Sequence, residues 1–230
     1  MLEQLKELVC RANKDLAASG LIIQTFGNVS GVDRAAGIMA IKPSGVAYED
    51  LAPRDIVMVS LGDGTVAEGR LRPSSDAPTH LALYRGFGDI GGVVHTHSLY
   101  ATAWAQACRE IPPYGTTHAD FFHGPVPCTR ALRGQEIRDD YEAAIGAAIV
   151  ERFAGLDPAH LPGVLVAGHG PFTWGRTPAD AVGNAVALEF VARAASLALQ
   201  IDPSCRPLQR ELLDKHFHRK HGPGAYYGQR

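Results

Sequence analysis

The segment Gly92-Val93-Val94-His95-Thr96-His97 joins a short apolar run to two histidines that are two residues apart. The apolar run predicts a buried strand, on which successive side chains point to opposite faces. Residues two apart share a face, so the imidazoles of His95 and His97 are expected close enough to bind one ion. Neutral imidazole is a common ligand of Zn²⁺ and its first-row neighbours. A pair of polar residues on an exposed strand face is the other interpretation.

His169 is a third candidate ligand. It lies between two glycines directly after the apolar run 164–167, and the end of a strand is a common place for a functional group. A turn histidine bonded to backbone is the alternative. Asp76 offers a fourth, oxygen ligand, although it also fits the N-terminus of a helix over 77–87. Three histidines and a carboxylate are typical of a catalytic metal site with an open position.

Three loops of small residues offer backbone N–H groups together with hydroxyl or amide donors, as a phosphate requires. They are Gly27-Asn28-Val29-Ser30, Lys42-Pro43-Ser44-Gly45 and Pro73-Ser74-Ser75. Lys42 adds a positive charge to the second loop. Each loop also fits an ordinary turn. Neither a Walker A loop nor a G-x-G-x-x-G fingerprint is present, so no motif supports a nucleotide ligand.

Amphipathic segments and short apolar runs indicate the fold class. Helices are expected from Leu2 to about Gly20 and over 77–87, 135–153, 177–200 and 208–216, with strands over 21–24, 38–42, 55–61, 65–68, 92–97 and 164–167. Gly62-Asp63-Gly64 predicts a hairpin turn. Hairpin signals mixed with helices indicate an α/β fold with a central, mainly antiparallel sheet flanked by helices. Because no break in composition divides the 230 residues, a single domain over 1–230 is expected.

The composition excludes several classes of protein. A formal net charge of −2 gives no general attraction to nucleic acid or to an anionic membrane. No apolar run reaches the roughly 20 residues that span a bilayer, and the first residues lack the apolar core of a signal peptide. The four cysteines are scattered without a C-x-x-C pair, which is typical of reduced thiols. A soluble, cytoplasmic protein without nucleic-acid or membrane partners is expected.

Seven short blocks, taken together, resemble the class II aldolase/epimerase family, and within it the epimerases. The blocks are G-N-V-S at 27–30, K-P-S-G-V at 42–46, P-S-S-D at 73–76, V-H-T-H-S at 94–98, G-T-T-H-A-D at 115–120, H-G-P-F at 169–172 and A-Y-Y-G-Q at 225–229. They follow one another in the order that the family shows and cover nearly the whole chain. Such an ordered series is highly specific.

The resemblance implies a class II aldolase-like fold assembled as a homotetramer, with active sites between subunits. It implies a divalent ion, usually Zn²⁺ with Mn²⁺ or Co²⁺ as alternatives, held by His95, His97 and His169 with Asp76 in the same site. The family's substrate and phosphate contacts fall on Gly27, Asn28, Ser44, Gly45, Ser74 and Ser75. Its acid/base pair falls on Asp120 and Tyr227, with Tyr227 delivered by the neighbouring subunit, and His216 lies near the site. Without the resemblance, Asp120 fits a turn-capping carboxylate and the terminal tyrosines fit a frayed tail.

The implied reaction interconverts L-ribulose 5-phosphate and D-xylulose 5-phosphate, two phosphorylated ketopentoses. The C4 proton is not α to the C2 carbonyl, so simple enolisation cannot remove it. Cleavage of the C3–C4 bond and re-addition to the other face of the aldehyde invert C4, and a divalent ion stabilises the enediolate between the two steps. Each face requires a proton carrier at the C4 oxygen, and Asp120 and Tyr227 fit these two positions.

Two alternatives share the fold. An aldolase of the L-fuculose-1-phosphate type uses the same ion and enediolate but carries glutamate at the position of Asp76, which favours the epimerase here. A non-catalytic assembly module is expected to lose metal ligands or the acid/base pair, and this sequence keeps both.

Overall fold

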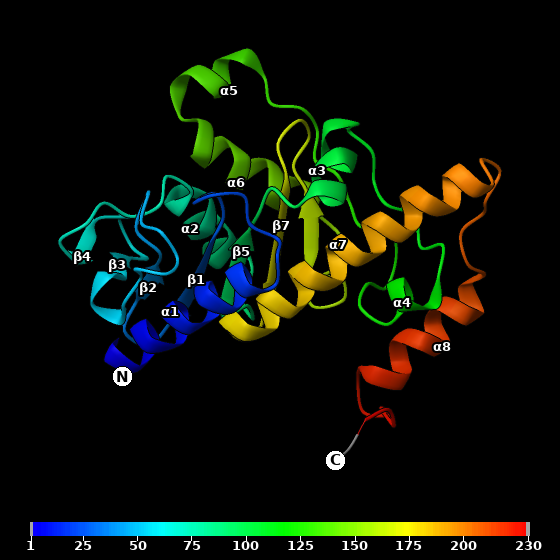
Figure 1. The fold of residues 1–230 in the computed structure, drawn as a ribbon, viewed down its shortest axis with the longest axis horizontal. Helices are drawn as coiled ribbons and strands as arrows, with labels where there is room; N and C mark the ends of the chain where they lie inside the picture. Colours follow the sequence, from blue (N-terminus) through cyan, green and yellow to red (C-terminus); the bar gives the residue numbers. More distant parts are fainter. Residues whose placement is uncertain (1, 229–230) are drawn as a thin grey trace.

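In the computed structural model, which describes residues 2–228, the chain forms a seven-stranded sheet with helices on both faces (Figure 1). The strands are β1 (Asn28–Asp33), β2 (Ile38–Ile41), β3 (Val57–Ser60), β4 (Val66–Glu68), β5 (Gly92–His95), β6 (Gly163–Leu165) and β7 (Pro171–Gly175). Their order is β4-β3-β2-β1-β5-β7-β6, and each pair of neighbours is antiparallel. The predicted α/β fold with an antiparallel central sheet is confirmed.

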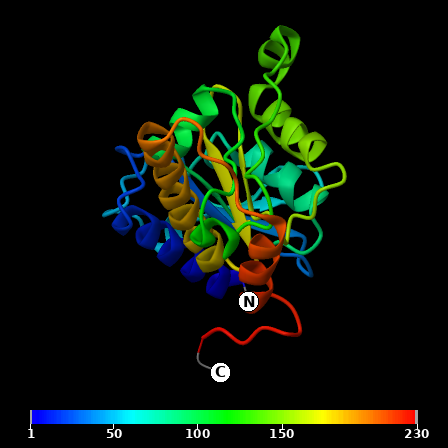
Figure 2. The ribbon, with the colours of Figure 1, turned by 90° about the vertical axis from the view of Figure 1, so that its right-hand side faces the viewer.

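Eight α-helices surround the sheet in the described part of the chain. They are α1 (Leu2–Ala18), α2 (Ala77–Gly86), α3 (Leu99–Gln106), α4 (Thr116–Ala119), α5 (Gly134–Asp139), α6 (Tyr141–Arg152), α7 (Pro178–Ile201) and α8 (Arg210–Lys220), besides the 3₁₀ turn η1 (Pro53–Asp55). Figure 2 shows the sheet between α1 and α7 on one side and α2 and α6 on the other. The short helix α4 packs against α8 at one end of the molecule.

Side-chain alternation on the strands divides the core between the two helical layers. On β5, Val93 packs into the cluster that holds α2 and α6, whereas Val94 packs with α1 and the start of α7. On β2, Met39 packs into the same cluster as Val93, whereas Ala40 packs against α1 on the other face of the sheet. All four side chains are buried, and full burial of one aliphatic side chain contributes about 1.5–3 kcal/mol. Because both faces are covered, β2 and β5 are mainly apolar in sequence without polar alternation.

Helix α7 lies directly on the sheet, as the sequence predicts for 177–200. The Thr177 hydroxyl accepts a hydrogen bond from the N–H of Asp180 at 3.1 Å, and Pro178 occupies the first turn. The beginning of α7 lies against Gly92 and Gly175, which are paired on β5 and β7. A Cβ on either glycine would lie 2.5 Å from Pro178 or Asp180, so only glycine permits this approach.

Two helix predictions need correction. The segment 135–153 is two helices rather than one, because Asp140 adopts an extended conformation (φ −157°, ψ 92°) between α5 and α6. Its carboxylate accepts the N–H of Ala143 at 3.1 Å and so caps α6. Helix α8 covers 210–220 instead of 208–216, and therefore includes basic residues that the sequence places in a frayed tail.

Three strand predictions need correction: one predicted segment is not a strand, and two strands that contain small residues or begin with proline were not predicted. The segment 21–24 is not a strand, since Gln24 has φ of 55° and the segment makes only an isolated bridge from Ile23 to Phe26. Strands β1 and β7 are missing from the prediction, because β1 contains the small residues of the first candidate loop and β7 begins at Pro171. The hairpin predicted at Gly62-Asp63-Gly64 is confirmed between β3 and β4.

Candidate metal centre and substrate site

The side chains of His95, His97 and His169 converge at one end of the sheet. The Nε2 atom of His95 lies 3.1 Å from the Nε2 atoms of both His97 and His169. One nitrogen from each ring lies within 4.8 Å of the other two. In a tetrahedral zinc site with Zn–N bonds of about 2.0–2.1 Å, neighbouring ligand nitrogens are about 3.3 Å apart. The observed spacing therefore suits a shared ion.

Each histidine reaches this point from a different local structure. His95 is the last residue of β5 and is buried, whereas His97 lies two residues beyond the strand and is half-buried. The strand is thus shorter than predicted, and the alternation argument for His97 does not hold, although the two rings do meet. His169 lies in the turn between β6 and β7, where its N–H donates to the carbonyl of Val166 at 3.0 Å and Gly168 has φ of 72°.

Hydrogen bonds fix how the rings present their nitrogens. The Nδ1 atom of His95 lies 3.0 Å from the carbonyl oxygen of Pro171, which only accepts, so the neutral ring carries its proton on Nδ1 and leaves Nε2 as a lone pair. The Nδ1 atom of His169 lies 3.0 Å from the hydroxyl of Tyr141, whose ring stacks on the imidazole. Burial and the neighbouring histidines lower the pKa of His97, and that of His169 to about 4. Neutral imidazoles with such partners are the form that binds metal ions.

Asp76 occupies the N-terminal position of α2, but its side chain makes no capping hydrogen bond. The Oδ2 atom instead accepts hydrogen bonds from Asn28 Nδ2 at 2.6 Å and from the Ser74 hydroxyl at 3.4 Å. Burial opposes ionisation, but electrostatic interaction with the His95 and His80 rings and the hydrogen bond from Asn28 together hold the pKa of Asp76 below its ordinary value. Its oxygens do not lie within 4.8 Å of all three ring nitrogens. The carboxylate is therefore beside the histidines rather than among them.

Hydrogen bonds join the three small-residue loops, which are far apart in sequence, into one surface. The N–H of Ser44 donates to the carbonyl of Arg72 at 3.0 Å, and the N–H of Ser74 donates to the carbonyl of Lys42 at 3.0 Å. Asn28 Nδ2 donates to the hydroxyl of Ser74 at 3.0 Å. Since Asn28 also binds Asp76, this surface continues to the histidines.

The residues predicted to bind substrate differ in exposure on this surface. Ser44, Gly45 and Ser75 are exposed, whereas Asn28 and Ser74 are buried beneath them. Gly27 directly precedes β1, has φ of 96° and lies close to the end of β5. A Cβ there would lie 3.0 Å from the carbonyl oxygen of His95 and 2.7 Å from a neighbouring side chain. The glycine thus permits the first loop to lie directly beside His95.

Lys42 does not present its charge on this surface. Its side chain is buried, and the ammonium donates to the carbonyl of Val46 at 2.6 Å and lies 4.7 Å from the centre of the Tyr48 ring. Burial lowers the pKa of Lys42 to about 8. The lysine therefore supports the shape of the second loop, and the charge that the sequence predicts for this loop lies beneath its surface.

The predicted acid/base residues belong to a second cluster. Asp120, at the end of α4, accepts hydrogen bonds from Arg219 Nε (3.0 Å) and Nη2 (2.7 Å) and from His216 Nδ1 (3.1 Å), and pairs with Lys220 at 3.3 Å. Burial opposes ionisation, but these partners hold the pKa of Asp120 below its ordinary value. The Tyr227 ring lies 4.7 Å from the Arg219 guanidinium and 4.6 Å from the Lys220 ammonium. Shared cations thus link Asp120 to Tyr227 within one chain.

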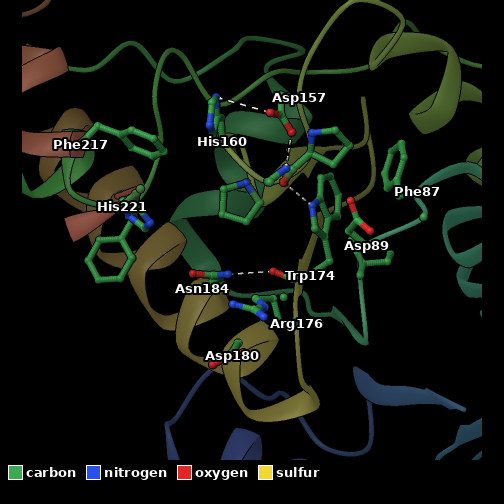
Figure 3. A pocket seen from close by; sticks show the side chains of 18 residues that line it. Phe87, Asp89, Asp157, His160, Trp174, Arg176, Asp180, Asn184, Phe217 and His221 are labelled. Atoms are coloured by element: carbon green, nitrogen blue, oxygen red, sulfur yellow. Dashed lines mark hydrogen bonds and ion pairs between the residues drawn. The ribbon is translucent and has the colours of Figure 1, made fainter. Parts of the chain in front are cut away.

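The histidines and this second cluster lie at opposite ends of the sheet. His95 marks one end of the paired strands β5 and β7, and Gly175 marks the other. A cavity of about 920 Å³ opens at the Gly175 end, between the sheet, α7 and α8 (Figure 3). Its wall includes Phe121, the neighbour of Asp120, and Phe217 of α8. The described chain therefore does not bring Asp120 and Tyr227 to its own histidines.

Residues 7–196 match the family model described as the Class II Aldolase and Adducin N-terminal domain. The chain belongs to the class II aldolase family. It is 54% identical over 229 residues to the L-ribulose-5-phosphate 4-epimerase UlaF of Salmonella paratyphi B, and 53% identical to that of Salmonella paratyphi C, with 100% of both chains covered in each case. The family resemblance stated from the sequence is confirmed.

Solved class II aldolase structures also match along most of the chain. A structure of L-fuculose 1-phosphate aldolase matches with a TM-score of 0.79 and 25% identity, covering 94% of this chain and 95% of that one. The L-fuculose-1-phosphate aldolase of Thermus thermophilus matches with a TM-score of 0.68 and 25% identity, covering 89% and 100%.

In this member of the class II aldolase family, reasoning from the sequence missed three residues whose side chains bind His169 or Asp120. Tyr141 binds His169 across 28 positions, and no local pattern marks it. Arg219 and Lys220 bind Asp120, and their only signal is the basic run near the C-terminus. Gln229, which ends the terminal block, lies outside the described residues.

Proposed function

We propose that this single-domain chain is a metal-dependent epimerase that interconverts L-ribulose 5-phosphate and D-xylulose 5-phosphate by cleaving and re-forming the C3–C4 bond. The observation that carries the proposal is the convergence of three imidazole rings beside the carboxylate of Asp76, in a chain 54% identical from end to end to relatives named for this reaction. Its proposed substrates are phosphorylated ketopentoses.

The donor set suits a divalent ion. His95, His97 and His169 would hold it, with Asp76 as a further ligand or as the carboxylate beside it. Imidazoles favour Zn²⁺, with Mn²⁺ and Co²⁺ as alternatives. When bound, such an ion acts as a Lewis acid toward the negative charge that develops on the sugar oxygens during C3–C4 cleavage.

The joined loops are proposed to hold the phosphate. Ser44, Gly45 and Ser75 are exposed, so the two serine hydroxyls can reach a phosphate, and Gly27, Asn28 and Ser74 support them from below. Such a group of small residues suits a phosphate dianion. Holding the phosphate keeps the two-carbon aldehyde in the site while it rotates to present its other face, so that the second bond forms without loss of the fragment.

Asp120 and Tyr227 are proposed to carry protons at the C4 oxygen, one on each face. Ionised Asp120 accepts a proton, and the phenol of Tyr227 donates one. His216, which binds Asp120, is proposed to orient its carboxylate.

Because the two clusters lie at opposite ends of one sheet, a second copy of the chain is proposed to supply both Asp120 and Tyr227. An exposed apolar stripe on α7 supports assembly: Val186, Phe190, Leu197 and Ile201 follow one another at intervals of four, seven and four residues, which places them on one helical face. Although α7 has the length and composition of a membrane span, its opposite face packs on β5 and β7. We propose a soluble, cytoplasmic homotetramer with its sites between subunits.

The second candidate is an aldolase, favoured by the likeness to L-fuculose 1-phosphate aldolase. A coupled assay that detects D-xylulose 5-phosphate formed from L-ribulose 5-phosphate, beside an L-fuculose 1-phosphate cleavage assay, separates the two. We expect the zinc-loaded protein to turn over the first substrate at least about 100-fold faster, since retained binding of both fragments favours epimerisation. Preferential cleavage of the second substrate would assign the aldolase. A folded protein that binds no ion and turns over neither would assign a non-catalytic assembly module.

A further inference from the structure

A second group of side chains with metal-ligand chemistry lies on α8, apart from the three-histidine cluster. Asp214 and His218 are four residues apart on α8 and so share a helical face. His123, in the segment after α4, meets them there. One ligand atom from each of the three residues lies within 4.8 Å of the other two.

Local packing fixes this group against the protein. Phe217 is buried, and four imidazole rings surround it: His123 at 4.4 Å between ring centres, His221 at 4.3 Å, His160 at 5.1 Å and His218 at 5.6 Å. The His123 side chain is 12% exposed and lies parallel to the phenyl ring. A preformed, partly buried imidazole beside a helix that offers two further ligands limits the entropy lost when an ion binds.

We propose that His123, Asp214 and His218 bind a first-row divalent ion through two imidazoles and one carboxylate, with a coordination position open to solvent. This donor set is that of open zinc sites. The proposal goes beyond the epimerase reaction and does not depend on it.

Ion binding replaces contacts that the structure already contains. The Nε2 atom of His123 lies 2.6 Å from Asp214 Oδ1 in a hydrogen bond. When the neutral ring instead carries its proton on Nδ1, Nε2 offers a lone pair to the ion. Arg210 competes for the same carboxylate, with its Nε 2.8 Å from Oδ1 and 3.0 Å from Oδ2. Arg210 is exposed, so it can move away at low cost.

The position of the group gives the ion a mechanical consequence. Helix α8 also carries Arg219, Lys220 and His216, which bind Asp120 at the end of α4. An ion held by His123 and α8 adds a second connection between the α4 region and this helix, besides the pairing of Asp120 with α8. The ion therefore stabilises the pairing of α4 with α8.

The test is a calorimetric titration of the chelator-stripped, full-length chain with Zn²⁺ alone. Wild type is expected to bind one ion at the three-histidine cluster and a second, more weakly, at α8. His218→Ala removes an exposed ligand and is expected to weaken the second event by at least about tenfold and leave the first unchanged. The matched control is His160→Ala, which removes a neighbouring imidazole outside the ligand group and keeps both events.

A second variant distinguishes an ion site from a purely structural contact between His123 and α8. Arg210→Ala frees the carboxylate of Asp214, so an ion site predicts tighter binding at the second event by about threefold or more. A purely structural His123–Asp214 contact predicts no gain. The proposal is overturned when wild type shows no second event, when His218→Ala retains it at full affinity, or when Arg210→Ala leaves it unchanged or weaker. Because Arg210 is on the surface, the Arg210→Ala variant is expected to fold. Its titration tests the proposal even if His218→Ala fails to fold.

Discussion

The two ends of the sheet present two different kinds of polar cluster. At the His95 end, imidazoles from the end of β5, the segment after it and a tight turn meet, and a backbone carbonyl and a phenol orient two of the rings. At the other end, Asp120 is surrounded by cations from α8, and Tyr227 lies exposed over them. The first cluster gathers three imidazoles within one chain. The second cluster satisfies its charges internally and offers a carboxylate and a phenol, so under the proposed function one folded chain holds two halves that belong to different sites.

The largest effect is expected from loss of a metal ligand. His97→Ala should abolish tight zinc binding and lower epimerase turnover by about 10³- to 10⁵-fold, because Lewis-acid stabilisation supplies several kcal/mol. His97 lies beyond β5 and is half-buried, so the fold is expected to survive. Metal content and the coupled assay measure both. Full zinc content in the variant would remove His97 from the ligand set.

Tyr227→Phe tests the other end of the sheet. Loss of the phenol should lower turnover by about 10²- to 10⁴-fold, with metal content and melting temperature unchanged. Tyr226→Phe is the matched control, since Tyr226 is the adjacent exposed tyrosine and has no proposed role. Near-normal activity of Tyr227→Phe with L-ribulose 5-phosphate would contradict its assignment.

Mixing the two inactive variants tests whether the halves come from different chains. Co-expressed His97→Ala and Tyr227→Phe subunits should recover about a quarter of wild-type turnover, because random assembly places an intact metal half against an intact tyrosine half at that frequency. Each variant alone is the control. No recovery in mixed oligomers would mean that both halves come from one chain.

Asp120→Asn tests the charged cluster through stability. Partners hold the folded-state pKa of Asp120 below its ordinary value, so ionised Asp120 stabilises the fold above the unfolded-state pKa of about 3.9, and this contribution is lost as the pH falls through the folded-state pKa. The variant should lose about 1–3 kcal/mol of unfolding free energy at neutral pH, and less on acidification. Urea unfolding at several pH values measures this, with the exposed Asp50→Asn as control. A difference that grew on acidification would contradict the ion-pair account.

The smallest effect is expected from Tyr141→Phe. The substitution removes the hydroxyl that binds His169 Nδ1 but keeps the stacked ring. Loss of such a partner weakens metal binding by about tenfold, with little change in stability because the tyrosine is partly exposed. Competition with a chromophoric chelator measures the affinity. Unchanged affinity would show that the Val166 turn alone orients His169.

Much of the fold followed from local patterns. The cap and length of α7, the hairpin after β3 and the first helix depend on residues close in sequence, and the structure confirms them. Strand β1 was not predicted, because its small residues have low strand propensity. The strand is stabilised by hydrogen bonds to β2 and β5, which the residues of the segment themselves do not indicate.

The candidate site shows the same division. Residue type and position along the chain predict the three histidines as ligands, since imidazole chemistry belongs to the side chain itself. The neighbours of Asp76 were not predictable, because Asn28 lies 48 positions away and draws the carboxylate from the helix end. Lys42 likewise carries a charge in sequence, but its ammonium binds the Val46 carbonyl inside the protein.

The sequence by itself determined which side chains can bind an ion, where the main helices begin, and which family the chain resembles, because these depend on chemistry and order along the chain. Only the tertiary structure decided that the three loops form one surface, that Asp120 joins Arg219 across 99 positions, and that His123 meets Asp214 across 91. The physical reason is separation along the chain: such contacts form only when the sheet and helices pack, and interactions between residues close in sequence do not specify them.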